Sequence, residues 1–339
     1  ETIQSQVEKE LIMKKLSKTA GKVAEQITEI IVELLESKNL TPWNCTWVGG
    51  GRSSNHKNYA SSLTSFYDSW LNQMLLECAM RKHDFTSTEW ITASELKKRK
   101  ISFKGIPTTG KIVGWRDAYY KTHEPSGETE WASSKQVSQC SYHPAQELIQ
   151  QGYIHVKLPK LYSLWNIDQF EELESRLPTK ETVQGTLNDD DVIKEAEAVI
   201  KNYKDKNTGL TVEIKNSRRA YYSPREDLVV LPEISQYDGV AEYYLTVFHE
   251  LAHSTGHKDR LNRKGITNND LFSGKTEYSY EELIAEMTAC FMNGTLGLES
   301  NLKNSASYIK GWSKYLKDNP HAFFNASMDG RKAQNYILA

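Results

Sequence analysis

The sequence contains few cysteines and lacks long hydrophobic segments. Its four cysteines show no CxxC spacing, which argues against a disulfide framework and against a thiolate zinc site. No apolar run approaches the roughly 18 residues that a membrane helix needs, so we expect no membrane span and no membrane partner. The first ten residues are acidic and polar, unlike a secretory signal. These absences favour a protein of the reducing cytoplasm.

The chain also lacks a strong net charge, internal repeats and low-complexity tracts. A formal charge of -2 at pH 7 implies no global electrostatic partner. The length of 339 residues permits two domains with sizeable cores. We predict a linker at residues 177–190, where Pro, Thr, Gly and Asp occur without periodicity. It would separate an N-terminal domain (1–176) from a C-terminal domain (191–339).

Apolar periodicity predicts that both domains contain helices and strands, an α+β fold class. For the N-terminal domain we expect helices over 6–38, 60–82 and 93–100, and strands over 111–115, 153–157 and 161–165. The polar stretch 122–141 is expected to be a loop or hairpin. For the C-terminal domain we expect a helix over 190–204, strands over 211–214 and 227–231, two helices that carry the motifs described next, and a helical tail over 305–338.

The most informative motif is HELAH at residues 249–253, inside an apolar helical run. Two histidines four residues apart lie on one helix face, about 40° apart, and their imidazoles can bind one metal ion. Glu250 can reach a water molecule on that metal and act as a general base. The pattern is typical of zinc-dependent hydrolases, most often peptidases, and His249 and His253 are therefore predicted ligands of Zn²⁺.

A catalytic zinc site takes three protein ligands and a water molecule, so a third ligand is needed. A second predicted helix carries Glu282 and Glu286 at i and i+4, next to an apolar stripe. We predict Glu282 as the metal ligand and Glu286 as the acid that holds a histidine ligand by its other ring nitrogen. His257, which follows the helix-ending Gly256, remains an alternative ligand or a second-layer residue.

The N-terminal half contains the residue types that bind single-stranded nucleic acid. Basic side chains contact phosphates, and exposed aromatic rings stack on bases. Such residues are interleaved here, although buried tryptophans beside a solvated lysine face would give the same pattern. The residues that we predict to contact nucleic acid are Trp43, Arg52, Lys57, Lys97, Lys98 and Lys104.

Several segments resemble the ArdC-type antirestriction proteins. In the C-terminal half they are YYSP with Asp227, the HELAHSTGH segment, the RLNR segment at 260–263, and EELIAE at 281–286. In the N-terminal half they are Pro42-Trp43, the segment 90–92 and the segment 164–169. The similarity is strongest over residues 190–338. The segment 102–111 departs from the family pattern, because one basic residue stands where the family has several.

The resemblance implies an N-terminal single-stranded-DNA-binding domain joined to a zincin-like metallopeptidase domain. The protein's expected partners are single-stranded DNA, with double-stranded DNA as a further option, and an unidentified peptide or protein substrate. Its expected role is to protect incoming phage or plasmid DNA in the cytoplasm of a bacterial host. In hydrolysis, Tyr221 or Tyr222 could stabilise the oxyanion, although both also read as ordinary strand aromatics. Two alternatives remain: a non-proteolytic protein that shields single-stranded DNA by occupancy and has a structural metal site, and a protease for proteins crosslinked to DNA.

Overall fold

The computed structural model describes residues 3–38, 56–60, 69–123, 126, 128–133, 136–137, 144–174, 189–267, 279–298 and 306–339. The chain divides into two compact units. The first contains Glu1–Gln26 and Val113–Tyr162, and the second contains Ile27–Ile112 and Ser163–Ala339. Most of the predicted linker lies outside the described residues, and its last two residues begin a helix, so the predicted domain boundaries stay a prediction.

A five-stranded sheet organises the N-terminal part of the sequence, in the order β1-β2-β5-β3-β4. Its strands are β1 (Lys57–Asn58), β2 (Glu89–Ile91), β3 (Gly110–His123), β4 (Glu128–Trp131) and β5 (Ile154–Asn166). β1 pairs parallel with β2, whereas β2 pairs antiparallel with β5 and β3 antiparallel with β4. The β3–β4 pair lies where the sequence indicated a loop or hairpin.

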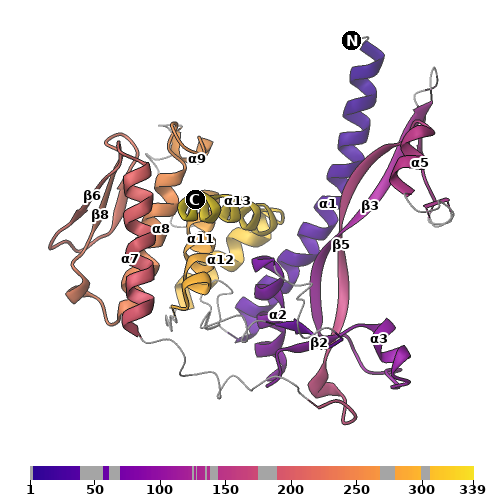
Figure 1. Cartoon of the computed structure of the whole chain (residues 1–339), viewed down its shortest axis with the longest axis horizontal. Helices are drawn as coiled ribbons and strands as arrows, with labels where there is room; N and C mark the ends of the chain where they lie inside the picture. The colour runs from indigo at the N-terminus through magenta and orange to yellow at the C-terminus, as the bar shows by residue number, and fades with distance from the viewer. Residues whose placement is uncertain are drawn as a thin grey trace. The chain divides into compact units, whose positions relative to one another are not determined.

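β3 and β5 form a long two-stranded ribbon, which Figure 1 shows as two adjacent twisted strands. The strands predicted at 153–157 and 161–165 are one continuous strand, β5, although Pro159 lies inside it. β2 pairs with β5 only at Trp165 and Asn166. At Pro159 the side of β5 that faces away from β3 is therefore an edge, and edge strands are where a sheet tolerates proline.

Four α-helices occur in the same part of the described sequence as this sheet. They are α1 (Ile3–Lys38), α2 (Trp70–His83), α3 (Ala93–Lys98) and α5 (Pro144–Gln150). Residues 61–68 of the predicted helix 60–82 lie outside the described residues. Thr92 is the N-cap of α3, and its side chain accepts a hydrogen bond from the Glu95 amide. The turn η1 (Ile167–Gln169) closes the end of β5 with a capping box from Asn166.

A second, three-stranded sheet lies in the C-terminal part, in the order β6-β8-β7. β6 (Thr211–Ile214) pairs parallel with β8 (Leu228–Leu231), and β7 (Tyr221–Ser223) pairs antiparallel with β8. The preceding helix is α7 (Asp189–Lys206). In Figure 1 this sheet flanks α7 and α8, and α8 contacts β7 and β8 directly.

Two helices form the centre of this part, α8 (Val240–Thr255) and α11 (Tyr280–Leu296). They pack against each other, and α11 also packs along α13 (Ala322–Leu338). Phe248 and Leu251 of α8 are fully buried in the shared apolar core. The short turns η2 (Ile234–Gln236) and α9 (Lys264–Thr267) lie before and after α8.

The predicted helical tail is two helices rather than one. α12 (Ala306–Asp318) ends shortly before Pro320, and α13 begins at Ala322. A proline inside a helix removes a backbone donor and clashes with the preceding turn, which accounts for the break.

The cysteines and the hydropathy of the helices give two further findings. Cys78 is a buried free thiol. No described helix is long and apolar enough to cross a membrane.

Candidate metal centre

The two histidines of HELAH project from the middle of α8. Helical spacing places His249 and His253 one turn apart, and their Nε2 atoms lie 3.2 Å from each other. Both rings therefore direct the same nitrogen towards a common point. The His253 side chain is 7% exposed and that of His249 is 20% exposed, so the site is mostly shielded from solvent.

The third side chain comes from the first turn of α11. Ser279 caps this helix by accepting a hydrogen bond from the Glu282 amide. The carboxylate oxygens of Glu282 lie 3.4 Å from Nε2 of His249 and 3.6 Å from Nε2 of His253. The ligand atoms of these three residues all lie within 4.8 Å of one another, the one such group of His, Cys, Asp or Glu in the described sequence. Two imidazoles and a carboxylate suit Zn²⁺ and related divalent ions.

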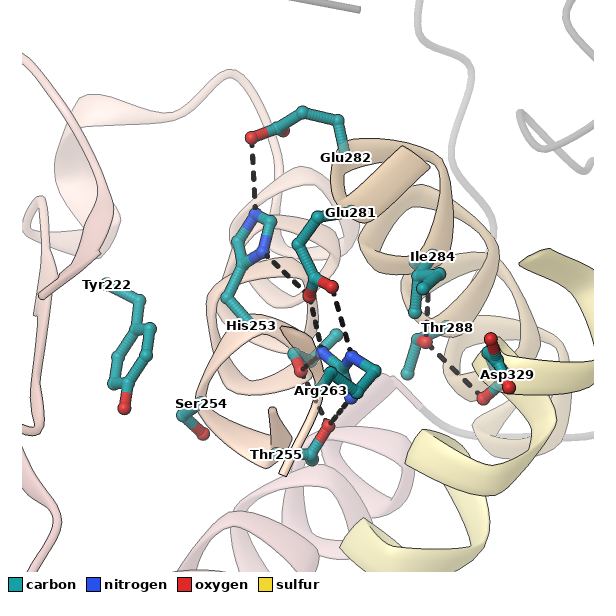
Figure 2. A network of polar contacts seen from close by, with 12 residues as sticks. Tyr222, His253, Ser254, Thr255, Arg263, Glu281, Glu282, Ile284, Thr288 and Asp329 are labelled. Atoms are coloured by element: carbon teal, nitrogen blue, oxygen red, sulfur yellow. Dashed lines mark hydrogen bonds and ion pairs between the residues drawn. The ribbon is translucent and has the colours of Figure 1, made fainter. Parts of the chain in front are cut away.

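Glu281 contacts the other side of His253, a contact that the sequence analysis did not foresee. Figure 2 shows the His253 ring between Glu282 on one nitrogen and Glu281 on the other. Oε1 of Glu281 lies 3.5 Å from Nδ1 of His253, somewhat longer than an ordinary hydrogen bond. A carboxylate in this position orients a ligating imidazole and raises its basicity.

Arg263 holds Glu281 in place. Its guanidinium donates to both carboxylate oxygens, at 3.1 and 2.5 Å. It also donates to the Thr255 hydroxyl at 2.6 Å and to the Ala252 carbonyl at 2.8 Å, which ties this pair to the end of α8 (Figure 2). Gly256 permits this approach, because a Cβ there would lie 3.0 Å from the Arg263 guanidinium and 2.5 Å from Ile266.

Glu286 and His257 occupy different surroundings. Glu286 is half-buried one turn after Glu282, and its charge is among those that raise the pKa of His249. His257 lies past the end of α8, where its Nδ1 is 3.5 Å from Oδ2 of Asp259. It lines an open cavity of about 780 Å³ together with Arg225 and Lys258. The structure thus brings Glu282, and not His257, to the two histidines of HELAH.

The carboxylates strongly perturb the histidines. Burial acts to lower the pKa of His253, but Glu281 and Glu282 outweigh it and raise that pKa to about 10. Burial likewise acts to raise the pKa of Glu282, but its contacts with His249 and His253 hold the pKa well below its usual range. In the absence of a metal, the cluster therefore holds a proton on His253 opposite ionised acids.

Glu250 adjoins this cluster on α8. It is 8% exposed, and its charge contributes to raising the pKa of both His249 and His253, as expected for a carboxylate close to both rings.

The Tyr222 hydroxyl belongs to a clamp at the end of α8. It donates to Oδ1 of Asp227 at 2.8 Å, while Arg260 pairs with Asp227 and donates to the Ser254 carbonyl at 2.6 Å. Burial and the neighbouring Asp227 raise the pKa of Tyr222. These contacts join the YYSP and RLNR segments, because they fasten the β7–β8 hairpin to the end of α8.

The residues predicted to contact nucleic acid are only partly described. Trp43 and Arg52 lie outside the described residues. Lys57 is in β1, Lys97 and Lys98 are in α3, and Lys104 follows α3 in a loop. Lys98 lies 3.7 Å from Glu95, so its charge is partly compensated.

Each of the two parts of the sequence matches a known protein family. Residues 21–146 match the N-terminal domain of the anti-restriction factor ArdC, and residues 195–329 match a zincin-like metallopeptidase family. The chain therefore contains a match to an ArdC N-terminal domain followed by a match to a zincin-like metallopeptidase domain. Its fold is also similar to the crystal structures of antirestriction ArdC from plasmid R388. The metal-free form has a TM-score of 0.60 at 24% identity, and the Mn(II)-bound form has 0.59 at 23% identity. Both comparisons cover 93% of this chain and 96% of the other.

Curated relatives of this chain include much longer proteins. Two Escherichia coli proteins named DNA primase TraC are 29% identical over 322 residues and 30% identical over 225 residues. The aligned regions cover 93% and 65% of this chain but only 27% and 14% of those relatives. The protein y4eC of Sinorhizobium fredii is 29% identical over 124 residues, which is 36% of this chain and 38% of that protein. The chain thus spans about a quarter or less of the TraC relatives.

Proposed function

We propose that this chain is a metal-dependent peptidase of the antirestriction type that also binds single-stranded DNA. The observation that carries the proposal is the convergence of His249, His253 and Glu282 from two helices, with Glu250 beside them. This donor set, together with a buried acid one residue after the first histidine, fits peptide hydrolysis better than a closed structural site.

The side chains of the site have distinct roles in this proposal. His249, His253 and Glu282 would hold Zn²⁺, which supplies Lewis acidity and a water of lowered pKa when it is bound. Glu250 accepts a proton from the attacking water and delivers it to the leaving amine. Glu281 and Arg263 keep the His253 ring in its orientation. Divalent-metal binding is also supported by the Mn(II)-bound form of the R388 ArdC protein.

The DNA-binding part of the proposal rests on the N-terminal match. The matched residues 21–146 correspond to the N-terminal domain of an anti-restriction factor, and the TraC relatives are named as DNA primases. We therefore assign single-stranded DNA as the partner of the N-terminal part, and the bacterial cytoplasm as the compartment in which it meets that DNA.

The decisive experiment separates metal binding from hydrolysis. We expect Glu250→Gln to keep stoichiometric zinc and to lose about 100-fold or more of the hydrolysis rate, because a general base contributes about 10²–10⁴. Cleavage of fluorescein-labelled casein would be measured with and without single-stranded DNA, and zinc by elemental analysis. Glu242→Gln, in the first turn of the same helix, is the matched control and should leave both quantities unchanged. Loss of zinc from the Glu250 variant would contradict the assigned role.

A second experiment decides whether hydrolysis or occupancy protects DNA. Unmodified plasmid DNA would be transferred into a restricting bacterial host that contains the wild-type chain or Glu250→Gln. We expect protection to fail with the variant while its affinity for single-stranded DNA stays intact. If protection survives, DNA binding alone carries the function, and the metal site has a structural role.

A further inference from the structure

One face of the β3–β5 ribbon carries an exposed aromatic ring set over a glycine. In a strand, successive side chains alternate between faces, so Gly114 and Arg116 share one face of β3 and Trp115 lies on the other. A Cβ on Gly114 would lie 2.6 Å from the Tyr162 ring of β5. The ring therefore lies against the bare backbone at Gly114. We call the face that carries Gly114, Arg116, Lys160 and Tyr162 the Tyr162 face.

The Tyr162 ring remains available to solvent. The residue is 39% exposed, although its ring covers the glycine. Lys160, two residues earlier on the same face, places its ammonium 5.1 Å from the centre of the ring. A ring supported from below by backbone and flanked by a cation has the arrangement of a base-stacking platform.

The charges on this face favour a polyanion. Neither Arg116 nor Lys160 forms an ion pair with any residue that the structure describes. By strand alternation, no Asp or Glu of β3 or β5 lies on the Tyr162 face. Two uncompensated cations beside an exposed ring complement a phosphate backbone and its bases.

The opposite face of the ribbon is less suitable. It carries Asp117, which lies 2.6 Å from His155 across the strands. Further along, Tyr119 packs with Leu148 of α5 in an apolar cluster. That face thus presents an acid and a covered region, although Trp115 on it is 50% exposed.

We infer that the Tyr162 face is where this protein stacks the bases of single-stranded DNA. The inference rests on the proposed DNA-binding function and names its surface within the first compact unit. It differs from the contacts predicted from sequence, of which those in the described residues lie on β1, α3 and the loop after α3. A single strand is the fitting ligand, because its bases are free to stack on the ring whereas those of a duplex are stacked on one another.

The test compares two exposed aromatic residues on opposite faces. Binding of a fluorescein-labelled 20-nucleotide oligo(dT) to the full chain would be followed by fluorescence anisotropy. We expect Tyr162→Ala to raise Kd about 5- to 140-fold, the effect of losing one base–aromatic stack. Tyr162→Phe should restore most of the affinity, because it keeps the ring. Trp115→Ala, on the opposite face, should leave Kd within about twofold.

A second variant tests the platform without removing the ring. Gly114→Ala places a methyl group where the ring now lies, so the ring must move, and Kd should rise although Tyr162 is still present. Circular dichroism would verify the fold of each variant.

The outcomes distinguish this inference from the proposed function. If the wild-type chain does not bind oligo(dT), DNA binding itself is wrong. If the wild-type binds but Tyr162→Ala binds equally well, or if Trp115→Ala alone loses affinity, the assigned surface is wrong and DNA binding stands. An equal loss of affinity for a blunt duplex would overturn base stacking as the contact.

Discussion

The α8–α11 metal centre and the Tyr162 face use charge in opposite ways. At the metal centre, His253 and Glu281 are almost fully buried, and each charged group faces another. On the ribbon, Arg116 and Lys160 are exposed and unpaired within the described sequence. A small ion is bound by buried ligands whose positions are fixed before the ion binds. A polyanion is bound by exposed cations, which replace the water and counterions around its phosphates. Substitutions should therefore affect stability and metal affinity at the first region, and only DNA binding at the second.

The largest effect on stability is expected at Arg263. Arg263→Ala leaves the buried Glu281 carboxylate without its guanidinium partner, so the free energy of unfolding should fall by about 3–5 kcal/mol. Urea denaturation of the metal-free protein at pH 7 would measure it. Arg225→Ala, at an exposed site beside the cavity, is the control and should stay within about 0.5 kcal/mol. A loss below about 1 kcal/mol for Arg263→Ala would show that the pair is solvated rather than buried.

Metal affinity should respond next most strongly, at Glu281. We expect Glu281→Gln to weaken zinc binding about 10- to 100-fold, the usual cost of losing the partner of a ligating histidine. Competition with a chromophoric chelator would give the affinity. The isosteric change Glu286→Gln is the matched comparison, because Glu286 is the residue to which the sequence analysis gave this role. A larger loss for Glu286→Gln would reverse the assignment made from the structure.

The contrast between these two acids shows what sequence reasoning could reach. His249 and His253 were predicted as ligands from the HELAH motif and the period of one helix. Glu282 was predicted from its i, i+4 spacing to Glu286 on a second helix. Glu281 precedes Glu282 by one residue, so helix periodicity places it on a different face. It contacts His253 only because the first turn of α11 meets α8, an approach angle that no local pattern encodes. Arg263 was noted as part of a motif, but its pairing with Glu281 depends on the turn after α8.

The ribbon was harder to predict for a related reason. β5 was expected as two strands, and its continuity through Pro159 depends on having β3 on one side and an edge on the other. The position of Tyr162 over Gly114 joins two strands that are distant in sequence, so strand propensity alone does not show it. By contrast, the α+β class and the order of most elements follow from apolar periodicity and turn residues, and these were predicted.

Metal binding at the α8–α11 metal centre should depend on pH to a moderate extent, and the Tyr162 face should not share this dependence. Glu281 and Glu282 raise the pKa of His253 to about 10, so at pH 7 a metal ion must displace its proton. Zinc affinity should therefore increase as pH rises from 6.5 to 9, by up to about tenfold per pH unit for each proton released. Isothermal titration calorimetry in buffers of different ionisation enthalpy would count the protons. An affinity independent of pH would show that His253 is already neutral.

The raised pKa of His253 also determines whether the stability of the metal-free protein rises or falls with pH. A histidine whose pKa is raised on folding stabilises the fold fully below its unfolded pKa of about 6.5, and that contribution is lost as pH rises through about 10. The metal-free protein should thus lose stability over this range. Because bound metal replaces the proton, the difference in Tm between metal-loaded and metal-free protein should widen as pH rises. A constant difference would contradict the linkage.

The smallest effect on stability is expected on the Tyr162 face. Lys160→Gln removes an exposed, unpaired charge, so the free energy of unfolding should change by less than about 0.5 kcal/mol. Its effect should appear instead in DNA binding, where the slope of log K against log salt should become shallower by about 0.7, the share of one phosphate contact on a single strand. Lys121→Gln is the matched control, because Lys121 lies on the opposite face of the same ribbon and pairs with Glu130 at 3.3 Å. That change should cost a few tenths of a kcal/mol in stability and leave the salt slope unaltered. If Lys160→Gln and Lys121→Gln changed the free energy of unfolding and the salt slope equally, an ion pair would not determine whether a lysine of this ribbon stabilises the fold or binds DNA. The proposed contrast between the metal centre and the Tyr162 face would then be wrong for the ribbon.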